Sequence, residues 1–148
     1  MSVKLATDIL IRDDPNRDRL RLAVSRAFGV APGFVTVTEA TGDEPIPEDV
    51  MVLLLHQPEI MPGDFPTWYD LSVSEGLLDR IEPAISAVAH ELGTIIVTDA
   101  DDYFEMTLHL PDGTRHTVEL YQGDDDAFRI TPEIRRLIDQ AGHHVSVR

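Results

Sequence analysis

The most informative segment for the fold runs from Phe104 to Tyr121 and reads FEMTLHLPDGTRHTVELY. Apolar and polar residues alternate on both sides of the turn segment 111–113, a pattern typical of a β-hairpin. A three-residue loop pairs Leu108 with His116 and collects the apolar side chains on one face. A two-residue loop would shift the pairing and place apolar side chains opposite polar ones. The alternation therefore predicts a three-residue loop with Gly113 in the left-handed conformation.

Outside the hairpin, hydrophobic periodicity predicts the remaining elements. Strands are expected at residues 3–12, 34–38, 50–56, 68–73 and 94–98, and helices at residues 16–28, 72–92 and from 131 onward. Asp14 should cap the first helix. The second should begin at the capping-box spacing of Ser72 and Glu75 and be kinked or split at Pro83. The resulting order is β-α-β-β-β-α-β-β-β-α.

This order predicts a single α+β domain over residues 1–148, built on a twisted, largely antiparallel sheet. The first part, β-α-β-β followed by a later α-β, is compatible with a ferredoxin-like βαββαβ core that carries one inserted strand. The C-terminal hairpin would then extend the sheet, and the last helix would cover it.

The composition excludes several classes of protein. The chain has no cysteine, which removes disulfides, thiolate nucleophiles and cysteine-ligated metal sites. The longest apolar run, residues 50–55, is too short to cross a bilayer. We therefore expect a cytoplasmic protein with no membrane partner. The six histidines lack zinc-ligand spacing, with His109 expected outside the hairpin and His116 inside, and no cofactor is expected.

The net charge of −15 is concentrated in the middle of the chain. Residues 31–79 contain ten acids and no Lys or Arg, and residues 80–128 contain eleven acids and two arginines. Such a field repels nucleic acid and attracts basic proteins or cations. The alternative is an acidic solubility surface, as in a cell with high internal salt, because Lys4 is the only lysine.

The hairpin carries the first candidate binding surface. The three-residue loop places Glu105 directly opposite Glu119, with Tyr121 beyond them, and like charges so placed are destabilising. Either a nearby arginine or a basic partner would relieve the repulsion. The alternative is an exposed sheet face on which solvent screens the charges.

A second candidate follows the strand at 94–98, where Asp99, Asp101 and Asp102 add to an acidic surface. The spacing of Asp99 and Asp101 resembles the nucleophile motif of haloacid-dehalogenase-type phosphotransferases, but too little chain follows for that fold. Together with the acidic run 124–126, these carboxylates could bind a divalent cation. A small metal-dependent enzyme using Asp99 and Asp101 is therefore one alternative.

The proline-rich loop 57–66 and the residues after it supply the third candidate, Phe65 and Trp68. Aromatic side chains on a stiff loop lose little entropy on binding and often dominate protein interfaces. The alternative is that both rings fold back onto the core.

A small, acidic, cysteine-free chain without a catalytic constellation is similar in general character to bacterial immunity proteins, which capture basic toxins. The resemblance implies a non-enzymatic inhibitor that binds a basic protein through an acidic face. A secretion-type chaperone, which is also small and acidic and usually dimeric, is the other binding alternative, and either is compatible with a homodimer.

Overall fold

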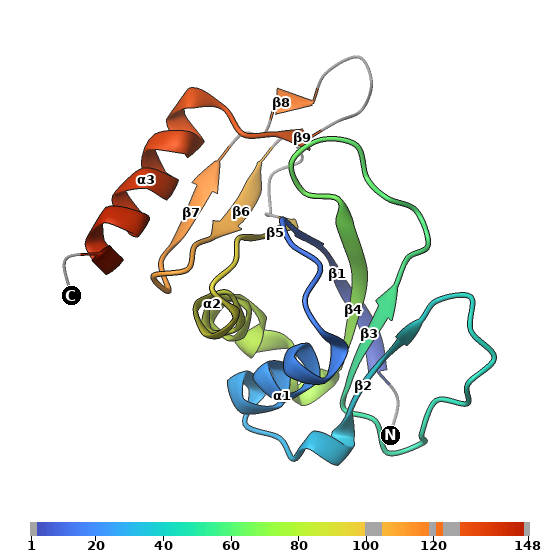
Figure 1. The fold of residues 1–148 in the computed structure, drawn as a ribbon. Coiled ribbons are helices and arrows are strands. Elements are labelled where there is room, and N and C mark those ends of the chain that lie inside the picture. Colours follow the sequence, from blue (N-terminus) through green and yellow to red (C-terminus); the bar gives the residue numbers. More distant parts are fainter. Residues whose placement is uncertain (1–2, 100–104, 119–120, 123–127, 147–148) are drawn as a thin grey trace.

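The computed structural model describes residues 3–99, 105–118, 121–122 and 128–146. These residues form one α+β domain around a seven-stranded sheet, as predicted (Figure 1). The strands of this sheet are β1 (Val3–Ile11), β2 (Val35–Glu39), β3 (Val52–His56), β4 (Thr67–Ser74), β5 (Ile96–Asp99), β6 (Met106–His109) and β7 (Arg115–Val118). A separate two-stranded sheet joins β8 (Tyr121–Gln122) to β9 (Phe128–Arg129). The helices are α1 (Arg17–Phe28), α2 (Ile81–Leu92) and α3 (Pro132–Ser146), with short 3₁₀ helices η1 (Pro32–Phe34) and η2 (Glu75–Arg80).

The strand order β2-β3-β4-β1-β5-β6-β7 contains the predicted ferredoxin-like core. Strands β5, β1, β4 and β2 take the positions of that core, and β3 is the inserted strand between β4 and β2. Among the described strands, β2 and β3 alone pair in parallel, so the large sheet is mostly antiparallel. The β6–β7 hairpin extends the sheet beyond β5, as expected.

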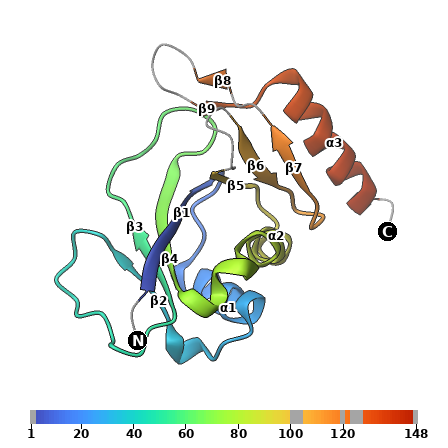
Figure 2. The same cartoon turned by 180° about the vertical axis from the view of Figure 1, so that it is seen from behind.

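Helices α1 and α2 cover one face of the sheet, and α3 packs against the hairpin on the opposite face (Figures 1 and 2). Ile9 and Ile11 of β1 pack in a cluster with side chains of α1 and α2. Leu10, which points the other way, joins a second cluster with the hairpin, residues of α3 and the loop 57–66. All three side chains are at most 5% exposed, so the end of β1 lies in the buried centre of the sheet, whereas its first residues are more exposed.

Side-chain caps define the starts of α1 and α3. Asn16, rather than the predicted Asp14, caps α1, because its side chain accepts from the amides of Asp18 and Arg19. The Thr131 hydroxyl caps α3 by accepting from the amide of Ile134, in agreement with the predicted start.

The predicted start of the second helix is wrong. The chain at 72–74 is still the end of β4, residues 75–80 form η2, and α2 begins only at Ile81. Pro83 therefore falls in the first turn of α2, where its missing N–H costs no helix hydrogen bond and causes no kink.

The hairpin register is confirmed. Leu108 pairs with His116, the Leu110 amide donates to the Thr114 carbonyl at 2.9 Å, and Gly113 has φ of 87°. The prediction that His109 faces outward is wrong, because its side chain is 0% exposed and packs against α2. His116 is half-buried instead. Alternation shows which side chains share a face, but α2 and α3 cover both faces here.

Candidate functional site

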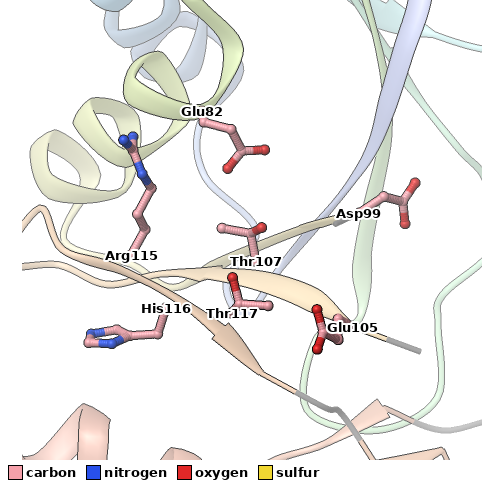
Figure 3. Close-up of a pocket in the computed structure, with 7 residues that line it drawn as sticks. All are labelled: Glu82, Asp99, Glu105, Thr107, Arg115, His116 and Thr117. Atoms are coloured by element: carbon pink, nitrogen blue, oxygen red, sulfur yellow. The ribbon is translucent and has the colours of Figure 1, made fainter. Parts of the chain in front are cut away.

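An acidic hollow of about 420 Å³ lies between the start of α2 and the strands β5, β6 and β7 (Figure 3). Its lining consists of Glu82, Asp99, Glu105, Thr107, Arg115, His116 and Thr117. Asp99 and Glu105 are among the residues predicted to bind a partner. Glu82 and Arg115 come from other elements, and no local sequence pattern connects either of them with Asp99.

Negative charge exceeds positive charge in the acidic hollow. Glu82 extends from α2 towards the strands, and Arg115 rises from β7 towards the same helix (Figure 3). Three acidic residues, Glu82, Asp99 and Glu105, thus line the hollow together with Arg115. Burial raises the pKa of Asp99, and the neighbouring charge of Asp8 raises it further. The excess of carboxylates favours a cationic ligand.

A buried histidine, His109, lies beside the acidic hollow. Its Nδ1 is 2.8 Å from Ser86 Oγ, and its Nε2 is 3.0 Å from Thr98 Oγ1 and 3.4 Å from Glu82 Oε2. Burial lowers the pKa of His109 to about 4, and the charge of Arg115 acts in the same direction. The ring is therefore neutral at pH 7. A carboxylate at Nε2 favours the N–H there, which leaves Nδ1 to accept from Ser86.

Contacts run from Ser86 to His109 and from His109 to Glu82. A serine nucleophile, its general base and the acid that orients the base are connected in the same way. However, Ser86 is only 5% exposed and lies inside α2, where helix hydrogen bonds occupy the amides that could stabilise an oxyanion. It borders a more open hollow of about 620 Å³ between α2 and the hairpin turn. The geometry therefore supports a structural network that holds α2 against β5 and β6.

Three aspartates form a carboxylate row across adjacent strands. Asp70 of β4 lies directly opposite Asp8 of β1, and Asp99 of β5 follows the pair formed by Ile9 and Thr98. Burial raises the pKa of Asp8 to about 6, with a further contribution from its hydrogen bond to Asp70. The Gln57 amide donates to Asp70 at 2.6 Å. The burial of Asp8 beside Asp70 therefore favours the neutral form of Asp8.

Of the two aromatic candidates, one is buried and the other is partly buried. Phe65 is 1% exposed in the second core cluster, and Trp68 is partly buried against the same cluster. The ring of Phe65 is therefore unavailable as an interface anchor, and the alternative that it folds back onto the core is correct. Its burial follows from the position of the loop 57–66 over the sheet.

Several candidates lie outside the described residues, namely Asp101, Asp102, Glu119 and the run 124–126, and the side chain of Tyr121 does as well. The opposition of Glu105 and Glu119 stays a prediction for this reason. Within the described ranges, no group of three or more His, Asp or Glu side chains is arranged to hold a metal ion. No helix in the described part of the chain is long and apolar enough to cross a bilayer.

Comparisons with protein-family models, curated proteins and solved structures gave no significant match to this chain. The arrangement of the acidic hollow, the buried histidine and the carboxylate row is therefore the basis for assigning a function.

Proposed function

We propose that this protein is a non-enzymatic inhibitor of the immunity type, which captures a basic protein by receiving a Lys or Arg side chain in the acidic hollow. The observation that carries the proposal is the presence of Glu82, Asp99 and Glu105 in the lining of one hollow of about 420 Å³. The cytoplasmic location and a homodimer stay predictions that accompany it.

The chemistry of the lining fits a guanidinium or an ammonium group. Carboxylates only accept hydrogen bonds when ionised, and guanidinium presents five N–H donors in a fixed planar arrangement. The hydroxyls of Thr107 and Thr117 add further acceptors at the same wall. Charge-assisted hydrogen bonds of this kind are about twice as strong as neutral ones.

The charge of the whole chain supports the same function at long range. A net charge of −15 accelerates the encounter with a basic partner, and the acceleration falls as salt screens the field. Arg115 opposes the incoming cation locally. Its presence would favour a partner whose basic side chain enters from the side of Glu105 and Asp99.

The test is affinity capture from the native host with wild-type protein and two charge-reversal variants. Glu105→Lys changes the acidic hollow, whereas Asp43→Lys makes the same charge change on an exposed loop near β2, at the other end of the sheet. The expected result is a basic protein that elutes at moderate salt, is lost with Glu105→Lys and is retained with Asp43→Lys. Thermal melting of both variants checks that they fold.

Two outcomes contradict this function. Equal loss with both variants would indicate only a general charge effect. A client that remains bound at high salt and needs detergent for release would instead indicate the secretion-chaperone alternative, in which apolar contacts hold an unfolded chain.

A further inference from the structure

The carboxylate row connects the interior of the sheet to the acidic hollow. Asp8 and Asp70 are partners on β1 and β4, and Asp99 is next to Asp8 on β5, where its amide donates to Thr7 Oγ1 at 3.2 Å. Side chains of Asp8 and Asp99 lie on the same face as Leu10 and Val97 by strand alternation. Asp99, the last residue of β5, also borders the hollow.

The environment of Asp8 favours proton uptake. Asp70 faces it from β4 and Asp99 from β5, and both carry the same charge as Asp8 when ionised. Two neutral donors are also present. The Gln57 amide donates to Asp70, and the indole N–H of Trp68 near Asp8 acts against proton uptake, because it lowers the pKa of Asp8. Half-buried carboxylates that face one another on neighbouring strands do not ionise independently.

We infer that the charge of Asp8, which lies beside Asp99 at the edge of the acidic hollow, regulates cation binding there. The regulation of binding rests on the proposed function. When Asp8 is neutral, the row loses one negative charge beside the hollow, and the attraction for a basic side chain weakens. When Asp8 ionises, the attraction is restored. Binding of the basic partner would therefore be stronger in neutral than in mildly acidic solution.

Two measurements test this inference, and the first is independent of the proposed function. The first follows the carboxyl carbon resonances of Asp8 and Asp99 by NMR between pH 4 and 8, without any partner. In wild type the resonance of Asp99 should respond as Asp8 titrates, because the two carboxyl groups are neighbours. In Asp8→Asn that response should disappear and Asp99 should ionise at lower pH. Asp70→Asn should lower the pH at which Asp8 ionises.

The second measurement is calorimetric titration with a hexa-arginine peptide at pH 5 and pH 7.5. Wild type should bind about three- to fivefold more tightly at pH 7.5, as expected for one charge about 10 Å from the ligand in a partly exposed site. Asp8→Asn should reduce this difference, and the remote variant Asp43→Asn should keep it in full.

Each outcome has a definite meaning. An Asp99 titration that is unchanged in Asp8→Asn overturns the inference, and so does a pH difference in peptide binding that is as large in Asp8→Asn as in wild type. Failure of the peptide to bind at either pH counts against capture in the acidic hollow, while the NMR titration still decides whether Asp8 controls the charge of Asp99.

Discussion

The Nδ1 atom of His109 lies 2.8 Å from the Ser86 hydroxyl, in a network that is closed to solvent between α2 and the sheet. The histidine is 0% exposed and neutral, and it accepts from one helix residue while its other nitrogen faces Thr98 and Glu82. A polar pair buried in this way specifies how α2 sits on the sheet, because any other placement leaves its groups without partners.

Acid should destabilise the protein through His109. Its folded pKa of about 4 lies below the unfolded value of 6.5, so the unfolded chain binds the extra proton between these values. Stability from this group is present above pH 6.5 and is lost as pH falls through 4, by an amount on the order of 3 kcal/mol. Urea unfolding at pH 7 and pH 4 measures it. His109→Gln should remove this pH dependence, whereas His116→Gln in the same hairpin should retain it.

Ser86→Ala should destabilise the protein by about 1–3 kcal/mol at pH 7, because it leaves a buried ring nitrogen without a donor. Denaturant unfolding gives this value. Ser72→Ala, at a partly exposed strand position, is a suitable control and should cost much less. A loss below 0.5 kcal/mol for Ser86→Ala would show that Nδ1 of His109 is not its acceptor.

Asp8→Asn should stabilise the protein above pH 6, by about 1 kcal/mol after allowance for partial exposure. The folded pKa of Asp8, about 6, lies above the ordinary value of 3.8, so the folded state holds the proton more tightly. Its contribution is therefore largest at low pH and is lost as pH rises through 6. Thermal melting at pH 5 and 8 should show a gain for Asp8→Asn only at pH 8, and no such gain for Asp43→Asn.

Asp8 and His109 titrate with opposite effects on stability. Between pH 4 and 6, acid strengthens the fold through Asp8 and weakens it through His109. The pH dependence of wild-type stability over this range should therefore be shallow. The double variant Asp8→Asn with His109→Gln should be shallow too, while each single variant should be steep in its own direction. Parallel curves for all four proteins would contradict the opposing assignments.

Gly113→Ala should destabilise the hairpin by about 1 kcal/mol, since the residue has φ of 87° and alanine is strained there. Its closest neighbour in the space of a new Cβ is His90 at 4.0 Å, so the cost comes from the backbone and not from crowding. Gly33→Ala in η1, where φ is not positive and the space is open, should be neutral or slightly stabilising. Denaturant midpoints compare the two.

Arg115→Ala should tighten binding of the hexa-arginine peptide by about threefold, because it removes the positive charge from the acidic hollow. Arg19→Ala on α1 is a control with the same charge change outside the hollow. Equal effects of the two substitutions would mean that the peptide responds to net charge alone.

Local sequence patterns alone predict the hairpin register and the order of the elements. The alternation around residues 111–113 and the glycine in the turn specify the hairpin register, because a shift by one residue would reverse every side chain. Periodicity likewise predicts the order of the elements. The second helix shows the limit, since the spacing of Ser72 and Glu75 matches a capping box although β4 continues through Ser74 to pair with β1. Tertiary pairing outweighed the local signal there.

The candidate site was decided by the tertiary structure. Asp8, Asp70 and Asp99 are far apart in the chain, and they meet only because β1 lies between β4 and β5. Glu82 joins Asp99 only because α2 packs across the strands, and the same packing buries His109 on a face that alternation alone assigns to solvent. Sequence periodicity specifies which residues of one element share a face. Strand order and helix placement, which depend on long-range packing, decide what that face meets.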